Sequence, residues 1–280
     1  MIISVASGKG GTGKTTVAVN LALTLEKFYP VQFLDCDVEE PNSHLFLKPQ
    51  LVENKPVTIP IPEILEEKCT FCGRCAEVCA YNALAVLKDT VLVFPELCHG
   101  CGGCSLLCPE KAIKERGQRI GLIEFGRANN IQFINGRLDI GQALSPPLIR
   151  EIKKHKNSTR EIIIDSPPGT SCPVIEAVKG SNFSLLVTEP TPFGLNDLKL
   201  AVETLRKLNI PLGVIINRAG IGNGQVEEYC KQEKIPILMT IPMDRKIAVA
   251  YSEGKSIIET QPSYEKKFEQ LFEKIKRLVK

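Results

Sequence analysis

Residues 8–15 have the sequence Gly8-Lys9-Gly10-Gly11-Thr12-Gly13-Lys14-Thr15, which fits the pattern G-x₄-G-K-[ST]. An apolar run over residues 2–6 precedes this stretch, and a helical pattern over 14–27 follows it. In such a strand–loop–helix unit, the glycines let backbone N–H groups close around phosphate oxygens, and the helix N-terminus favours their negative charge. Lys14 is then placed to reach the β- and γ-phosphates, and the Thr15 hydroxyl to bind Mg²⁺. The stretch predicts a nucleoside triphosphate site with its supporting strand and helix.

The alternation of apolar runs and helical segments continues along the chain. Strands are expected at 31–34, 161–164, 185–188, 212–216 and 235–239, and helices at 148–154, 196–208 and 264–280. This order predicts an α/β fold, a mostly parallel sheet flanked by helices. Residues 119–140 are expected to form antiparallel strands that turn at Asn135-Gly136. The segment 57–61, with prolines around it, is expected to form an edge strand or a linker.

Eight of the eleven cysteines fall into two runs of the same spacing, C-x₂-C-x₂-C-x₃-C, offset by 29 residues. The runs are Cys69, Cys72, Cys75 and Cys79, and Cys98, Cys101, Cys104 and Cys108, the second followed by Pro109. Two such runs are what a bacterial two-cluster ferredoxin uses to hold a pair of [4Fe–4S] clusters. Chain length and the absence of a signal sequence disfavour a secreted disulfide framework, and zinc knuckles would use paired CxxC motifs instead.

The cysteine segment interrupts the α/β pattern. We therefore expect a discontinuous nucleotide-binding domain made of residues 1–63 and 117–280. Residues 64–116 are expected to form an inserted domain, a small α+β unit of the bacterial ferredoxin type.

Composition limits the class of protein. The chain has 280 residues, of which 43% are hydrophobic and 24% charged, as is ordinary for a globular protein. A net charge of +3 is too small to suggest a nucleic-acid partner. No stretch is long and apolar enough to cross a bilayer, and the first strand leaves no room for a signal peptide, so a cytoplasmic location is expected. The amphipathic segment 264–280 fits a helix that closes the sheet better than a membrane-surface helix, so membrane association is not expected.

A second lysine in the loop, Lys9, makes the pattern more specific when it is taken with the segments Asp35-Cys36-Asp37 and Asp165-Ser166-Pro167-Pro168-Gly169. With these features the chain resembles the MinD/ParA/Mrp family of deviant-Walker ATPases, which includes the nitrogenase iron protein. It looks most like the MinD-superfamily ATPases that contain an inserted ferredoxin domain. The resemblance implies Mg²⁺-dependent, partner-stimulated hydrolysis of ATP to ADP and phosphate. It also implies an ATP-dependent dimer, either with a second copy or with a related ATPase.

The resemblance implies roles for single residues. Lys9 would cross a dimer interface to the partner's phosphates, and Asp37 would orient the attacking water, so that these two and Lys14 are the catalytic candidates. Thr15, Asp35 and Asp165 would lie near Mg²⁺, directly or through water. The expected nucleotide-binding residues are Gly8, Lys9, Gly10, Gly11, Thr12, Gly13, Lys14, Thr15, Thr16, Asp165, the switch glycine Gly169, the adenine-site residues Asn217 and Arg218, and Pro242 and Asp244 of the loop across the base.

The clusters are expected to share the two runs crosswise, because in two-cluster ferredoxins the fourth cysteine of each run ligates the other cluster. One cluster would use Cys69, Cys72, Cys75 and Cys108, and the other Cys98, Cys101, Cys104 and Cys79. The first run departs from the usual pattern in having Ala80 where proline is common. A further cysteine, Cys172, has the spacing from Asp165 of a cluster ligand in the nitrogenase iron protein. No second unassigned cysteine lies between residues 110 and 165, which favours a structural thiol.

Three functions are compatible with this sequence. The first is an ATPase that couples an ATP-driven conformational or dimer switch to electron transfer through two [4Fe–4S] clusters, with a redox partner protein. The second is an iron–sulfur cluster carrier or assembly factor of the Mrp type, with an iron–sulfur partner. The third is a MinD/ParA-like positioning protein whose clusters sense redox state. Two complete four-cysteine cages favour the first, because carriers usually hold labile clusters on few exposed cysteines.

Overall fold

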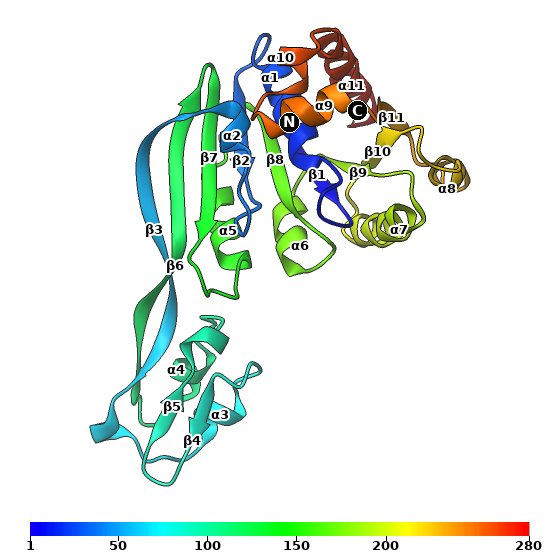
Figure 1. Cartoon of the computed structure of the whole chain (residues 1–280). Coiled ribbons are helices and arrows are strands. Elements are labelled where there is room, and N and C mark those ends of the chain that lie inside the picture. The colour runs from blue at the N-terminus through cyan, green and yellow to red at the C-terminus, as the bar shows by residue number, and fades with distance from the viewer. Residues whose placement is uncertain (280) are drawn as a thin grey trace.

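The computed structural model describes residues 1–279, and its main feature is a nine-stranded sheet (Figure 1). In spatial order the strands are β11 (Ile237–Pro242), β10 (Leu212–Ala219), β9 (Phe183–Thr188), β1 (Ile2–Ser7), β8 (Glu161–Pro168), β2 (Val31–Asp35), β7 (Ile131–Leu138), β6 (Ile113–Ala128) and β3 (Gln50–Ile64). All neighbours from β11 to β7 are parallel, whereas β6 runs antiparallel to β7 and β3. The expected α/β fold with a mostly parallel sheet is confirmed.

Helices cover both faces of this sheet (Figure 1). One face packs against α1 (Lys14–Leu25), α2 (His44–Leu47), α10 (Ile257–Thr260) and α11 (Ser263–Val279), with α9 (Arg245–Ser252) nearby. The other packs against α5 (Pro146–Lys154), α6 (Cys172–Val178), α7 (Pro192–Lys207) and α8 (Gln225–Gln232). Strands covered on both faces need apolar side chains in both directions, and β1, β2 and β8, which each carry adjacent apolar residues, are almost continuously buried.

The C-terminal helix α11 closes one face of the sheet. Its apolar stripe is buried in the core, at Tyr264, Phe268, Leu271, Phe272 and Ile275. This stripe is therefore occupied by contacts inside the chain, as expected of a helix that closes the sheet. Among residues 1–279, no helix is both long and apolar enough to span a bilayer.

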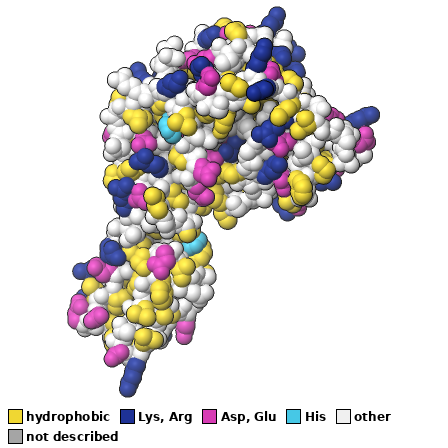
Figure 2. Space-filling model, viewed as in Figure 1, with side chains coloured by type: hydrophobic (Ala, Val, Ile, Leu, Met, Phe, Trp, Pro, Cys, Tyr) yellow, Lys and Arg dark blue, Asp and Glu magenta, His cyan; other side chains and the backbone are white. Residues whose placement is uncertain are grey.

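The edge strand β3 and its neighbour β6 form a long two-stranded ribbon that leaves the sheet and carries a smaller lobe (Figure 1). Pairing continues to the last residues of β3, where Ile64 lies opposite Ile113. Segment 57–61 is thus part of an edge strand, a position that tolerates Pro56, Pro60 and Pro62 because one side of the strand needs no hydrogen bonds. Figure 2 shows hydrophobic side chains gathered over the middle of the small lobe.

The small lobe contains a two-stranded sheet of β4 (Leu84–Val86) and β5 (Val91–Val93) and the short helices α3 (Arg74–Glu77) and α4 (Gly103–Leu107). Its two halves fold alike at the 29-residue offset of the cysteine runs. A 3₁₀ turn at Glu66–Lys68 corresponds to one at Pro95–Leu97, and α3 corresponds to α4. The backbone has positive φ at Gly73 and at the equivalent Gly102. The sequence repeat is therefore also a structural repeat.

The expected hairpin turn at Asn135-Gly136 is wrong, because both residues lie inside β7. The β6–β7 connection is instead at residues 129–130, where Asn129 has a φ of 49°. Gly136 has a packing role: a Cβ atom there would lie 2.4 Å from Ile152 Cδ1 and 2.7 Å from Val38 Cγ1. The glycine thus allows α5 to approach the strand, and only its sequence neighbours suggested a turn.

Candidate functional site

The loop between β1 and α1 has the backbone of a phosphate cradle. It ends at Gly13, which has a φ of 94°, and no side chain of the described residues caps the following helix. The first N–H groups of α1 are therefore available to an anion. Close packing against other segments requires glycine at two positions of this loop. A Cβ atom at Gly8 would lie 2.2 Å from the carbonyl oxygen of Asp197, and one at Gly13 would lie 2.4 Å from Asn217 Nδ2.

Lys14 and Asp37 form a buried ion pair in this cradle, with Nζ 2.5 Å from Oδ2. Burial lowers the pKa of Lys14, but the carboxylates of Asp165 and Asp37 outweigh this and raise it, so the side chain is a cation. Burial also raises the pKa of Asp37, although Lys14 opposes the effect. A bound phosphate would compete with Asp37 for Lys14, which would free the carboxylate to accept a hydrogen bond from water.

Three polar side chains lie in register on neighbouring strands. Asp35 of β2 lies opposite Asp165 of β8 on one side and Asn135 of β7 on the other. Within the described chain, the two buried carboxylate oxygens of Asp165 accept no hydrogen bond. A buried carboxylate with free oxygens beside a phosphate cradle fits a Mg²⁺ ion, which prefers oxygen ligands and relieves the burial of the charge. Thr15, at the start of α1, is buried nearby and would supply the hydroxyl ligand.

Asp35 has a different environment from Asp165. Its Oδ1 accepts the backbone N–H of Asp37 at 3.1 Å, and its Oδ2 accepts the backbone N–H of Ser43 at 3.3 Å and the Ser43 hydroxyl. Burial, followed by the charge of Asp165, raises the pKa of Asp35 to about 8. These contacts hold the loop that carries Asp37, so any Mg²⁺ role of Asp35 would be through water.

The nucleotide-free protein should lose stability with rising pH because of Asp165. Burial raises the pKa of Asp165 from 3.8 to about 6. Because the folded-state pKa lies above the unfolded one, the contribution is fully present below about pH 4 and is lost as the pH rises to about 6. Urea unfolding of wild type and Asp165→Asn between pH 4 and 7 should show a flatter dependence in the variant. Asp89→Asn, at an exposed position, is the control. An equal pH dependence of stability in wild type and Asp165→Asn would contradict the role of Asp165.

The other predicted nucleotide-site residues come together beside the cradle. Gly169 has a φ of 96°, and its N–H donates to the Ser7 carbonyl at 2.9 Å. Asn217 Nδ2 donates to the Thr12 carbonyl at 2.8 Å, and Arg218 Nη2 donates to the Gly11 carbonyl at 3.3 Å.

The loop after β11 lies against the end of β10. Pro242 is paired with Ala219, and the N–H of Met243 donates to the Ala219 carbonyl at 3.0 Å. Asp244 caps α9 by accepting the N–H of Lys246 at 2.8 Å. The segments around Asn217 and Pro242 are thus neighbours, which is the arrangement needed to enclose a base.

Sequence reasoning missed Glu189, which lies next to this site. Its buried carboxylate forms ion pairs with Lys9, at 3.2 Å, and with Arg218, at 2.5 Å. Glu189 comes directly after β9, just as Asp165 comes directly after the predicted strand 161–164. A systematic search for carboxylates after predicted parallel strands could therefore have found it.

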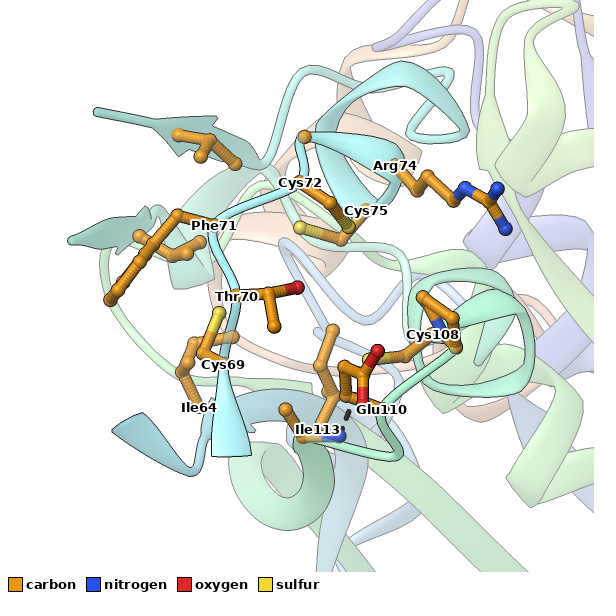
Figure 3. A pocket seen from close by; sticks show the side chains of 15 residues that line it. Ile64, Cys69, Thr70, Phe71, Cys72, Arg74, Cys75, Cys108, Glu110 and Ile113 are labelled. Atoms are coloured by element: carbon orange, nitrogen blue, oxygen red, sulfur yellow. Dashed lines mark hydrogen bonds between the residues drawn. The ribbon is translucent and has the colours of Figure 1, made fainter. Parts of the chain in front are cut away.

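The small lobe arranges the eight cysteines in two groups. Figure 3 shows the first, around a pocket between α3, the end of β3 and the start of β6. Its cysteines are Cys69, Cys72 and Cys75 of the first run and Cys108 of the second. A second pocket, beside Pro60 and Pro62 of β3, is lined by Cys98, Cys101, Cys104 and Cys79. The fourth cysteine of each run thus lies with the first three of the other run.

These groups suit a cluster better than a single ion. Across residues 1–279, no three Cys, His, Asp or Glu side chains converge closely enough to hold one metal ion. A cubane places irons and sulfides between its thiolates, so its ligands need to stand further apart than those of one ion. Sulfur ligands with a mostly apolar lining, such as Ile64, Val86 and Ile113 in the first cavity, fit the chemistry of iron–sulfur clusters.

Backbone N–H groups approach the sulfurs at equivalent places in both runs. Ala83 N–H donates to Cys79 Sγ and Ala112 N–H donates to Cys108 Sγ, each at 3.2 Å. Hydrogen bonds of this kind raise the reduction potential of a bound cluster. The two contacts match although Ala80 replaces the proline of the second run, so the substitution leaves this local backbone geometry unchanged.

The three remaining cysteines lie outside these groups. Cys36 and Cys230 are buried in the core, whereas Cys172 is exposed at the start of α6. Burial raises the pKa of Cys230 to about 11, as for an inert structural thiol.

Comparison with known proteins agrees with this geometry. The family described as "CobQ/CobB/MinD/ParA nucleotide binding domain" matches residues 3–257. The protein MJ0579 of Methanocaldococcus jannaschii is 34% identical over 262 residues, which cover 92% of each chain. A protein of Aquifex aeolicus named an iron-sulfur cluster carrier protein is 28% identical over 282 residues, covering 94% of this chain and 63% of the relative.

Solved structures show the same fold. The septum site-determining protein MinD of Pyrococcus horikoshii, complexed with Mg-ADP, superposes with a TM-score of 0.62 at 22% identity, covering 99% of this chain and 96% of the other. The fold, the phosphate cradle and the family match over residues 3–257 agree with one another. The chain therefore belongs to the CobQ/CobB/MinD/ParA family of nucleotide-binding domains.

Proposed function

We propose that this protein binds and hydrolyses MgATP and holds two [4Fe–4S] clusters, and that the nucleotide switch controls electron transfer through those clusters. The observation that carries the proposal is the crosswise grouping of eight cysteines in a lobe attached to the nucleotide domain. In this proposal residues 64–116 are an inserted ferredoxin-type domain. ATP brings two copies together, or one copy and a related ATPase, and a redox protein exchanges electrons with the clusters.

The chain's own residues supply the chemistry of hydrolysis. Lys14 and the N–H groups of the loop bind the phosphates, Asp165 and Thr15 hold Mg²⁺, and Asp37 orients the attacking water. Bound Mg²⁺ neutralises the charge that develops on the phosphates. Phosphoryl transfer depends mainly on such positioning and charge neutralisation, so these residues need no covalent intermediate.

The two cysteine groups lie in series along the ribbon. The cavity lined by Cys98 borders Pro60 and Pro62 of β3, whereas the cavity lined by Cys69 borders Ile64 at the end of the strand. The former is nearer the nucleotide domain, and a shared apolar cluster joins Cys98 to Cys36, which stands between the carboxylates Asp35 and Asp37. A rearrangement at Asp37 therefore has a packed route to the nearer cluster.

An iron–sulfur carrier is the second candidate, and the relatives named as carriers favour it. The two functions differ in whether the clusters leave the protein. We expect about eight irons per reconstituted chain, retained when the protein is incubated anaerobically with an apo-ferredoxin acceptor and MgATP. Electron exchange with a reduced donor should occur without loss of iron. Stoichiometric transfer of a cluster to the acceptor would replace the first function by the second.

A further inference from the structure

Glu189 links two cations at the edge of the nucleotide site. Its side chain is 7% exposed, and its two oxygens contact Lys9 Nζ at 3.2 Å and Arg218 Nη1 at 2.5 Å. One carboxylate carries a single negative charge, so this Glu189 bridge leaves one positive charge uncompensated beside the phosphate loop. A phosphate group entering this edge would compete with Glu189 for a cation.

The position of Glu189 is set by tight backbone packing. A Cβ atom at Gly194 would lie 2.3 Å from the Glu189 carbonyl oxygen, and one at Gly222 would lie 2.1 Å from the Pro190 carbonyl oxygen. The turn after β9 is thus held between the start of α7 and the loop after β10. Side-chain entropy opposes many surface ion pairs, but here the backbone that carries the carboxylate is tightly packed and the side chain is buried.

The two lysines of the loop are held by different carboxylates. Lys14 is 10% exposed and pairs with Asp37 inside the cradle, whereas Lys9 is 34% exposed and pairs with Glu189 at its rim. Lys9 cannot donate to Glu189 and at the same time extend away from its own chain. Arg218 contacts Glu189 independently and also donates to the Gly11 carbonyl, so Glu189 keeps a cation when Lys9 leaves.

We propose that Glu189 is a positioning residue that restrains Lys9 in the single chain and releases it when the triphosphate-bound form self-associates. This inference rests on the proposed function, in which Lys9 reaches the phosphates of a second copy. The Lys9–Glu189 pair must break for association, so its free energy opposes the dimer. Because Arg218 stays paired with Glu189, the release of Lys9 does not leave the buried Glu189 carboxylate unpaired, which would be much more costly.

Sedimentation velocity with a non-hydrolysable MgATP analogue tests this role. Glu189→Gln should self-associate at a protein concentration about tenfold lower than wild type, since a charged hydrogen bond has been removed from the single chain. Lys9→Ala should associate more weakly, and Lys9→Ala/Glu189→Gln should show no gain over Lys9→Ala. Glu203→Gln, which breaks the exposed Glu203–Lys207 pair on α7, is the charge-matched control and should match wild type.

A second measurement separates this inference from the proposed function. Acetylation of Lys9 in the nucleotide-free protein, followed by mass spectrometry, should be several-fold faster in Glu189→Gln than in wild type or Glu203→Gln, because the carboxylate no longer shields the nitrogen. Faster acetylation in a protein that never self-associates would leave the restraint intact and contradict only the proposed dimer. Equal acetylation rates, or weaker association of Glu189→Gln than of wild type, would overturn the role of Glu189.

Discussion

Replacing Cys75 together with Cys79 should remove both clusters, although the two cysteines belong to one run. Cys75 lines the same cavity as Cys108, and Cys79 lines the same cavity as Cys98. The Cys75→Ser/Cys79→Ser protein should therefore retain almost no iron, whereas Cys75→Ser/Cys108→Ser should retain about four irons per chain. Iron and sulfide analysis with EPR of the reduced, reconstituted proteins would measure this.

The comparison of these two double variants has an internal control, because each removes the same number of cysteines. Cys172→Ser removes an exposed thiol outside both groups and should retain about eight irons. If each run instead held its own cluster, the results of the double variants would be exchanged. That exchange would contradict the crosswise assignment of the ligands.

Lys14→Ala should abolish useful nucleotide turnover, with kcat/KM lowered by about 10²–10³-fold. Lys14 is the buried cation beside Asp165 and Asp37, and without it these carboxylates would repel the phosphates. Binding of a fluorescent ADP analogue, together with phosphate release, would measure both consequences. Asp37→Asn should separate nucleotide binding from hydrolysis, because this variant retains ADP binding and loses hydrolysis. An Asp37→Asn protein that hydrolyses ATP at the wild-type rate would contradict the role of Asp37.

Much of the fold followed from the sequence because its signals are local. The apolar run before the glycine-rich loop and the helix after it gave β1 and α1, and the later apolar runs gave the parallel strands. The long β3–β6 ribbon was harder to predict, because pairing over residues 50–64 and 113–128 joins segments far apart in the chain. The wrong turn at Asn135-Gly136 has the same origin, since the contacts that require Gly136 come from α5 and Val38.

The candidate site was predictable where chemistry is tied to spacing. The phosphate loop and the cysteine runs depend on residues close in sequence, and the structure gathers them around one cradle and two cavities. Roles set by tertiary contacts were not predictable. Asp35 accepts hydrogen bonds from Ser43, and Lys9 forms an ion pair with Glu189. Only folding brings the residues of each pair together.

The central claim is that nucleotide and clusters influence each other through the protein. Anaerobic redox titration of both clusters, followed by EPR, should be made without nucleotide and with a non-hydrolysable MgATP analogue. We expect the potential of at least one cluster to shift by about 59 mV or more, which for a one-electron couple is roughly 1.4 kcal/mol, and expect no shift in Lys14→Ala. Unchanged potentials in a wild-type protein with confirmed nucleotide binding would contradict direct coupling between the nucleotide and the clusters.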